Sequence, residues 1–402
     1  MSHAMQFSIT IFLILAMASI GLGKIGLSDD DELSTINVRD FGAIGDGTTD
    51  DSQAGYVNFI IESGKTFLLK PIRFEGPCRA SYINIQVLGT ITAPKSIYEW
   101  GGQSVDNWLI FFRVNGLIVN GKGTINGQGP IWWQQLPKNN LFHPLDGVSN
   151  KGPDALSFVG CNNLKLDHLN LINSPRRHVV IFNINGATIS NLNIIAPKES
   201  PNTDGIDIGQ STNIQLHYCN IKTGDDCIAI GPSSFYINIS NIACGPGHGI
   251  SIGSLGLNGR TDKVEEVQVR DCTFTGTQNG VRIKTWEGGS GYARKILFEG
   301  ITLNAADNPI IIDQYYCPNN MCSKQSTSGV KLSDISFTRV IGTTTTKNAI
   351  NLSCSKSVAC TNILLNHVNI KSAYSEDVVS SYCINAHGRF SDSVPPVDCL
   401  LN

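Results

Sequence analysis

Four polar residues in the middle of the chain stand where they could do chemistry together. Asp204, Asp226 and His248 follow one another at intervals of 22 residues, and Asp225 directly precedes Asp226. If the chain winds as a coil with turns of about that length, these residues fall at one angular position on strands roughly 4.8 Å apart. Hydrolysis of a glycosidic bond uses a protonated acid and a carboxylate that activates water. The spacing therefore predicts an acidic cluster with a histidine beside it, suited to that reaction.

Crowding should shift the acidity of this cluster. Three carboxylates that lie together cannot all stay ionised without repulsion, so at least one pKa is expected to rise and create the acid. Adjacent residues on a regular strand point to opposite sides, so Asp225 and Asp226 share a face only if the backbone departs from the pleat, which Gly224 allows. An ordinary polar turn is the alternative interpretation of this pair. The matching positions of Asp204 and His248 argue against it.

A basic pair follows the cluster at Arg282 and Lys284. The two residues stand two apart on an expected strand, hence on one face, where Arg can bind a carboxylate through two N–H groups and Lys adds a point charge. A solvated basic pair is the alternative. Upstream, Asn202 is a candidate substrate-binding residue, although a role in shaping the turn beneath Asp204 is favoured over contact with substrate. His178 either lines the cleft or is a packing or surface histidine.

The elements expected to carry these residues are short strands that return along most of the chain. Runs rich in Ile, Leu and Val, many opened by Asn, occupy residues 163–166, 187–189, 213–216, 236–239, 266–269, 295–298, 330–332 and 362–365. From Leu164 through Ile189, Ile214 and Ile237 the steps are 25, 25 and 23 residues. They then lengthen to about 30, as expected when loops extend single turns of a solenoid. Gly, Asn, Ser or Thr separates the runs, which is typical of strands and turns.

This repeat predicts an all-β protein, a single-stranded right-handed parallel β-helix. A β-sandwich would also give many short strands, but the regular step and the strand-initial Asn residues, which can stack as ladders, favour the β-helix. One continuous repeat predicts a single elongated domain over residues 24–402. A net charge of −3 gives no basis for binding nucleic acid or a membrane surface, and we expect a monomer.

The amino terminus predicts export. Residues 7–18 form an apolar run, and small residues follow up to Gly23, so residues 1–23 are interpreted as a cleaved secretory signal peptide. An uncleaved membrane anchor is the alternative, but the run is short for a full span.

Twelve cysteines agree with an oxidising compartment. The close pairs that could each staple a loop are Cys354 with Cys360, Cys317 with Cys322, Cys383 with Cys399, and, beside the acidic cluster, Cys227 with Cys244. No Cys-x-x-Cys pair occurs, so a zinc site is not predicted, and no other metal or cofactor is expected. Asn238 and Asn351 begin glycosylation sequons, which also arise by chance.

Four motifs in fixed order resemble those of one enzyme family. They are Asn202-Thr203-Asp204-Gly205, Gly224-Asp225-Asp226-Cys227, the tract from Gly247 through His248 to Gly256, and Arg282-Ile283-Lys284. At this spacing the set resembles the signature of the polygalacturonases, glycoside hydrolase family 28. The similarity runs from Asn37 to the carboxyl terminus and resembles the plant branch. The sequence around His248 and from Gln278 to Gly291 is most similar to pollen-type exopolygalacturonases.

The resemblance implies a hydrolase of the cell wall that cleaves the α-1,4 bonds of polygalacturonate with inversion, leaning towards attack at chain ends. It implies that Asp225 is the general acid and that Asp204 and Asp226 hold the nucleophilic water. His248 would orient or tune the acid through a hydrogen bond.

The same resemblance assigns the substrate-binding residues. Arg282 and Lys284 would bind the carboxylate of a galacturonate unit. Tyr316 matches a family aromatic residue that contacts the sugar, although Tyr315 stands directly beside it.

Two departures from the family pattern stand out. Family members have a helix and a first strand before the segment that matches Thr66 to Pro71, whereas here only Gly55 to Lys65 separates Ala54 from Thr66, which predicts a shortened amino-terminal cap. Asp207 stands where relatives commonly have histidine, and an extra acid there should weaken binding of an anionic substrate or shift the pH optimum.

Three alternative functions remain. An endo-acting enzyme would carry the same motifs. A pectin-binding or inactive homologue is suggested by the shortened cap. A pectate lyase shares the β-helix but would need a calcium-binding acidic site and an arginine base, which these motifs do not match.

Overall fold

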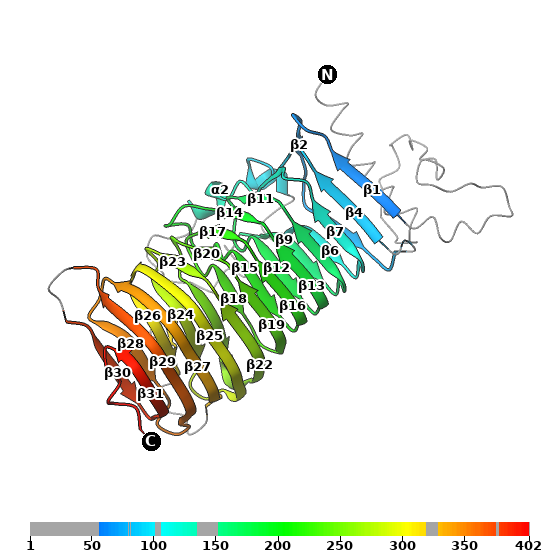
Figure 1. The fold of residues 1–402 in the computed structure, drawn as a ribbon. Coiled ribbons are helices and arrows are strands. Elements are labelled where there is room, and N and C mark those ends of the chain that lie inside the picture. Colours follow the sequence, from blue (N-terminus) through cyan, green and yellow to red (C-terminus); the bar gives the residue numbers. More distant parts are fainter. Residues whose placement is uncertain are drawn as a thin grey trace, which may run out of the picture.

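A computed structural model describes residues 56–78, 80, 82–100, 106–134, 152–318, 329–374 and 378–401. Here the chain forms a coil whose turns stack along one axis, from β1 at one end to β30 and β31 at the other (Figure 1). Strands of neighbouring turns pair in parallel, in a 20-stranded and an 11-stranded sheet. The predicted all-β parallel β-helix is confirmed.

The 20-stranded sheet contains two stacks of strands that meet at a corner. The first stack holds β1 (Tyr56–Ile61), β4 (Tyr82–Val87), β7 (Leu117–Asn120), β10 (Leu164–Asp167), β13 (Asn185–Ser190), β16 (Thr212–His217), β19 (Ser234–Ser240) and β22 (Thr261–Arg270). The second holds β2 (Thr66–Leu68), β5 (Thr90–Thr92), β8 (Thr124–Asn126), β11 (Asn170–Ile172), β14 (Asn193–Ile195), β17 (Asn220–Lys222), β20 (Ala243–Cys244) and β23 (Thr273–Thr275). Both continue into β25 (Ser290–Ala306), β27 (Lys331–Thr344), β29 (Cys360–Ser372) and β31 (Ala386–Val394).

The 11-stranded sheet is the third stack, and it carries the motifs. Its strands are β3 (Ile72–Glu75), β6 (Asn107–Phe112), β9 (Asp154–Val159), β12 (Val179–Phe182), β15 (Ile206–Gly209), β18 (Ile228–Ile230), β21 (Ile250–Leu255), β24 (Asn279–Thr285), β26 (Asn308–Asp313), β28 (Asn348–Ser353) and β30 (Ser380–Ile384). Short helical turns lie between strands at η3 (Ile97–Trp100), α2 (Pro130–Trp133) and η5 (Leu257–Gly259).

One apolar residue from each turn stacks in the interior at a shared register. Leu164 pairs with Ala187, which is followed by Ile214, Ile237 and Val267, and each of these is at most 4% exposed. Burial of β-branched side chains on a pleated surface favours strand here. The resulting rod of core residues fixes successive turns at the strand spacing, about 4.8 Å.

The predicted register of the repeat is right near the motifs and wrong at one upstream residue, Ile189, so the steps before and after it are both wrong. Leu164 lies opposite Ala187, not Ile189, and Ile189 pairs with Leu166 and Leu216. Ala187 and Ile189 lie on the same strand, and both face the interior of the coil. The alternating pattern therefore could not tell which of them matches Leu164.

Corners and ladders explain why polar residues recur between the strands. The corner between the first two stacks is a single residue with left-handed backbone, His168, Asn191, Tyr218 or Asn241, with φ between 50° and 57°. Asn and Asp tolerate this conformation best among residues with a side chain.

An asparagine ladder is present at the start of the second-stack strands, on residues other than the strand-initial asparagines noted in the sequence. Asn220 donates from Nδ2 to Oδ1 of Asn193 at 2.9 Å, and Asn193 donates to Asn170 at 3.2 Å. Of the asparagines noted in the sequence, Asn213 makes such a bond in the first stack, to Asn185 at 2.8 Å. These hydrogen bonds give partners to side-chain amides that would otherwise lack them between successive turns of the coil.

Three of the predicted disulfides form: Cys227–Cys244, Cys354–Cys360 and Cys383–Cys399. Cys322 lies outside the described residues, so its pairing with Cys317 stays a prediction.

The two ends of the domain are described unequally. Residues 1–55 lie outside the described part, and with them the predicted signal peptide and the sequence before the shortened cap. Gly55 to Lys65 is not a bare connection, because Tyr56–Ile61 forms β1 and pairs in parallel with β4. In the part of the chain that the structure describes, no helix has the length and apolar character needed to cross a membrane.

Candidate active site

The acidic cluster lies where each turn enters the third stack. Ile206, Ile228 and Ile250 pair at steps of 22 residues, and Asp204, Asp226 and His248 each stand two residues before them. Backbone bonds confirm the stacking, since Gly205 N donates to Asp226 O at 2.9 Å and Cys227 N donates to Gly249 O at 2.8 Å. The predicted register of the cluster is therefore confirmed.

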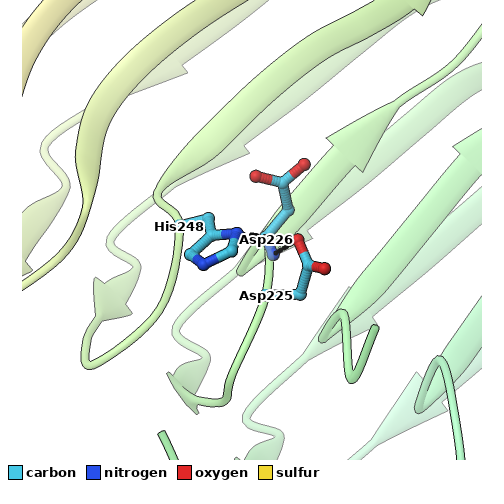
Figure 2. A group of neighbouring side chains, drawn as sticks. All are labelled: Asp225, Asp226 and His248. Carbon is cyan, nitrogen blue, oxygen red and sulfur yellow. Dashed lines mark hydrogen bonds and ion pairs between the residues drawn. The ribbon is translucent and has the colours of Figure 1, made fainter. Parts of the chain in front are cut away.

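Asp225 and Asp226 project in different directions from the same loop (Figure 2). Asp225 is 26% exposed in its side chain, and its Oδ1 accepts the backbone N–H of Asp226 at 2.8 Å and lies 2.9 Å from Nδ1 of His248. Asp226 is 1% exposed. Gly224 allows this loop because a Cβ there would meet Ser200 O at 2.0 Å. The pair thus presents one accessible and one buried carboxylate.

Two cations hold the buried carboxylate of Asp226. Lys284 Nζ lies 2.7 Å from its Oδ2, and Arg282 donates from Nη2 to Oδ1 at 2.8 Å. Ser251 also donates to Oδ1, at 2.9 Å, and accepts from Nε of Arg282 at 2.9 Å. Burial alone would raise the pKa of Asp226, but the charges of Lys284 and Arg282 outweigh it and lower the pKa, so Asp226 is ionised.

Asp204 is the group of the cluster whose pKa rises. Loss of water around this carboxylate raises its pKa well above the usual value, and the negative charges of Asp207, Asp225 and Asp226 raise it further. The expected rise of at least one pKa is confirmed, but it falls on Asp204, which the family resemblance assigns to the nucleophilic water and not to the general acid. The backbone carbonyl of Asp204 accepts the N–H of His178 at 2.8 Å and lies 3.0 Å from the Nδ1 atom of that residue.

His178 packs in the interior and does not line the cleft. Its side chain is 1% exposed, and burial lowers its pKa to about 4, so the ring is neutral at pH 7. The backbone N–H of Ser174 donates to Nε2 at 3.3 Å, which leaves Nδ1–H to donate to the carbonyl of Asp204. This histidine thereby fixes the loop that carries Asp204.

Asp207 lies beside the cluster on β15, in an ion pair with Arg177. Arg177 donates to Asp207 at 3.0 Å and to both oxygens of Asp154, which is also bound by Arg176. Oδ1 of Asp207 is buried and has no hydrogen-bond partner among the described residues. Burial raises the pKa of Asp207 to about 6, against the opposing charge of Arg177.

We expect Asp207→Asn to flatten the pH dependence of stability. The folded-state pKa is raised above the ordinary value of 3.8, so ionisation of Asp207 destabilises the fold as pH rises from about 4 to about 6. Asp207→Asn should therefore raise the free energy of unfolding at pH 7, relative to that at pH 4, by about 1–3 kcal/mol. Thermal unfolding of both proteins at pH 4 and pH 7 tests this. An unchanged difference between the two pH values would contradict it, and Asp271→Asn, a surface aspartate, is the matched control.

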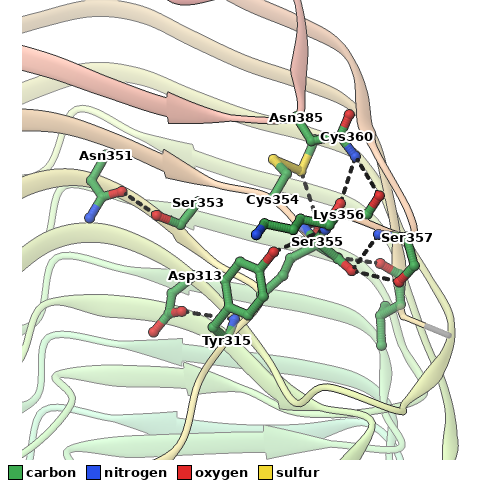
Figure 3. The surroundings of a disulfide bond; sticks show 12 residues. Asp313, Tyr315, Asn351, Ser353, Cys354, Ser355, Lys356, Ser357, Cys360 and Asn385 are labelled. Atoms are coloured by element: carbon green, nitrogen blue, oxygen red, sulfur yellow. Dashed lines mark hydrogen bonds between the residues drawn. A yellow bond between two sulfur atoms is a disulfide. The ribbon is translucent and has the colours of Figure 1, made fainter. Parts of the chain in front are cut away.

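The two neighbouring tyrosines separate clearly. Tyr316 lies beside the basic pair, with its ring 5.4 Å from Lys284 Nζ and edge-to-face with Trp286 at 5.4 Å. Tyr315 points to the Cys354–Cys360 loop, where its hydroxyl accepts the N–H of Lys356 at 2.9 Å (Figure 3). Tyr316 is therefore the tyrosine that lies next to the basic pair, and its contact with a sugar stays a prediction.

Asn202 takes the role expected from the sequence. Its backbone is left-handed, with φ 54°, and it forms the turn before Asp204. Its side chain is exposed and makes no hydrogen bond within the described part of the chain. The turn is held by Thr203, whose Oγ1 accepts the N–H of Gly224 at 3.0 Å.

The cluster contains ligand atoms of a kind that metals prefer, but its charges oppose a metal. Ligand atoms of Asp225, Asp226 and His248 lie within 4.8 Å of one another. Lys284 and Arg282 already neutralise Asp226, so a divalent cation would have to displace two buried cations. The donor set suits acid–base chemistry better.

Several contributors were not identified from the sequence. Ser251 lies on β21 and pairs with Arg282 in register, which a strand alignment would have shown. Trp286 stands two residues beyond Lys284, so the alternation of side chains along a strand places it on the same face as Lys284. Arg177 and Asp154 could not be found, since their contact joins the segment before β12 to the first residue of β9, which no local sequence pattern aligns.

Comparison with known proteins identifies the family. Residues 52–391 match the sequence model of Glycosyl hydrolases family 28. A probable polygalacturonase of Arabidopsis thaliana is 44% identical over 383 residues, covering 91% of this chain and 81% of the relative. An exopolygalacturonase of Zea mays is 34% identical over 407 residues, covering 96% and 97%. The crystal structure of an endo-xylogalacturonan hydrolase from Aspergillus tubingensis shares the fold, with TM-score 0.70, 24% identity and coverage of 90% and 96%. The chain therefore belongs to the polygalacturonases of glycosyl hydrolase family 28.

Proposed function

We propose that the protein hydrolyses the α-1,4-galacturonosyl bonds of polygalacturonate by a single displacement with inversion. The observation that carries this proposal is the division of the cluster into an accessible acid, Asp225 with His248 at 2.9 Å, and a buried, ionised Asp226. One group can give a proton while the other receives one, as an acetal requires.

In the proposed reaction Asp225 gives its proton to the glycosidic oxygen as the bond from that oxygen to the anomeric carbon breaks. A water held between Asp204 and Asp226 attacks the same carbon and loses its proton to the ionised carboxylate of Asp226. His248 is a positioning residue that orients Asp225 through Nδ1.

Arg282 and Lys284 have two roles in this proposal. They keep Asp226 ionised, and they face a galacturonate carboxylate together with Tyr316. Asn202 shapes the turn before Asp204 and acts on the substrate only indirectly, through the position of that turn. The site therefore selects a free acid over its methyl ester.

Lys284→Ala should raise the apparent KM on polygalacturonate about tenfold or more, since a charge-assisted hydrogen bond is lost. Highly methyl-esterified pectin should be a poor substrate of the wild type. Steady-state kinetics on both polymers tests this, at a temperature where the variant is folded. Lys331→Ala, an exposed lysine on β27, is the control. Equal turnover of the free and esterified polymers by the wild type would contradict the proposed binding of a carboxylate by Arg282 and Lys284.

The cellular setting is part of the same proposal. Residues 1–23 would direct export and be removed, leaving residues 24–402 as a monomeric catalytic domain in the extracellular cell wall. No cofactor, nucleic acid or stable membrane association is proposed. Export is supported by the cysteine pairs that form disulfides.

We further propose attack at chain ends, supported by the likeness to pollen-type enzymes and to the maize exopolygalacturonase. Exo action needs walls around the cleft. Two insertions expected to supply them, Gly256 to Val264 and Thr285 to Arg294, pack together, since β22 and β25 pair from Thr261 and Ser290 onward. A third, Pro130 to Asp154, lies largely outside the described residues.

Assay of new reducing ends on polygalacturonate, with and without a chelator, tests the function. We expect release that persists with the chelator, early monogalacturonate and slow loss of viscosity. No release by folded protein would contradict the proposed function. Loss of activity with the chelator, together with unsaturated products, would indicate a lyase. A rapid fall in viscosity with mixed oligomers would mean endo action.

A further inference from the structure

A second cavity opens at the opposite edge of the 11-stranded sheet from the acidic cluster. It has a volume of about 530 Å³ and is lined where β6, β9, β12 and β15 end. Its polar lining includes Arg113, Asn115, Asn162, Asn183, Asn185 and Gln210. No acidic side chain in the described part of the chain lines this cavity, whereas the catalytic cleft is rich in carboxylates.

The orientation of the amides makes the lining rich in donors. Oδ1 of Asn115 accepts the backbone N–H of Asn162 at 2.9 Å, and Oδ1 of Asn162 accepts that of Asn185 at 2.7 Å. Oδ1 of Asn185 accepts from Asn213 at 2.8 Å. Each carbonyl oxygen is thus used inside the protein. Across the described residues, the Nδ2 groups of Asn115, Asn162 and Asn185 have no acceptor and are left for a ligand.

Arg113 supplies the positive charge. It is exposed, and its guanidinium stacks on the ring of Phe112 at 4.9 Å without a carboxylate partner among the described residues. The nearby Arg73 pairs with Glu75 at 3.0 Å, so those two charges cancel. A lining of N–H donors around one unpaired guanidinium fits a ligand that is anionic and rich in oxygen acceptors.

The position of the cavity links it to the cleft. Gln210 follows Asp207 by three residues along β15 and the turn after it, which corresponds to about 10 Å. Phe182, which is 38% exposed and lies over Gly209, occupies the surface between them. An apolar ring of this kind can stack against the C–H face of a sugar.

We propose that this cavity is an accessory binding site for a uronate unit, in which Arg113 binds the carboxylate and the asparagine Nδ2 groups bind carboxylate and hydroxyl oxygens. The proposal rests on the proposed function for the identity of the polymer. The site anchors polygalacturonate near the catalytic cleft without taking part in bond cleavage.

Binding is measured directly by calorimetric titration of digalacturonate into full-length protein carrying Asp225→Asn, which prevents turnover. We expect two sites per protein, reduced to one by Arg113→Gln. Asn162→Asp should also abolish the second site, because it keeps the acceptor for Asn185 N–H but places a negative oxygen where a donor stood. Lys165→Gln, an exposed lysine on β10, should change nothing. A single site in the parent, or unchanged binding in both variants, would overturn the proposal.

Two further readouts separate this site from the catalytic one. In otherwise wild-type enzyme, Arg113→Gln should raise KM on the polymer about threefold to tenfold and leave kcat and the hydrolysis of digalacturonate or trigalacturonate unchanged. Galactobiose, which lacks the carboxylates, should not fill the second site; equal binding would refute uronate recognition. If the wild type does not cleave polygalacturonate, the proposed function fails, while the titration still decides whether the cavity binds uronate.

Discussion

Asp225→Asn should lower kcat on polygalacturonate at least about 100-fold while leaving KM nearly unchanged, since the amide keeps the shape of the side chain but has no proton to give. Asp225 accepts the N–H of Asp226 at 2.8 Å, and the amide oxygen of Asn can keep that bond. The fold should therefore survive. Initial rates with circular dichroism on the same samples test this expectation.

The control for Asp225→Asn is Asp271→Asn. Asp271 is exposed and left-handed, with φ 52°, a conformation that Asn also tolerates, and it lies at a corner of the 20-stranded sheet away from the cleft. It loses the same charge without touching the cluster. Activity of Asp225→Asn within a few-fold of wild type would show that another group is the acid.

Asp226→Asn should destabilise the fold as well as inactivate it. The substitution would leave Arg282 and Lys284 buried, with side chains 12% and 10% exposed, without their carboxylate. Breaking a buried ion pair from one side costs about 3–5 kcal/mol, because the remaining charges stay out of water. Urea or thermal unfolding measures the loss.

A second substitution separates the stability effect from the catalytic one. In the Asp226→Asn background, Lys284→Met removes one unpaired cation with a side chain of similar length, so part of the lost stability should return. Activity should not return, since the base is still missing. Wild-type stability of Asp226→Asn would contradict the charge network described here.

The residues that sequence alone placed correctly share one property: their position depends on the period of the coil. Asp204, Asp226 and His248 fall in register because the turns of the coil that lead from β15 to β18 and from β18 to β21 both have 22 residues. The disulfides Cys354–Cys360 and Cys383–Cys399 followed from proximity along the chain.

What the sequence could not supply depends on contacts across turns. The pattern predicted Arg282 and Lys284 on one face but not their bonds to Asp226, because that face is built from three strands. The crowding argument predicted a raised pKa without naming Asp204, since the outcome depends on which carboxylate the cations contact. Lys284 and Arg282 lower the pKa of Asp226, whereas desolvation and the neighbouring carboxylates raise that of Asp204. Ile189 was assigned to the wrong register, since two inward residues of one strand are equivalent in the pattern.

The anomeric configuration of the first product distinguishes the proposed single displacement from retention and from elimination. An oxygen of Asp225 and one of Asp226 lie within 4.8 Å, a spacing nearer to retaining glycosidases than to inverting ones. The proposed single displacement, in which a water between Asp204 and Asp226 attacks the anomeric carbon, nevertheless requires inversion. Proton NMR during the first minutes of polygalacturonate digestion should show the β anomer at the new reducing end, before mutarotation. A first product with the α configuration, or with an unsaturated ring, would contradict the account.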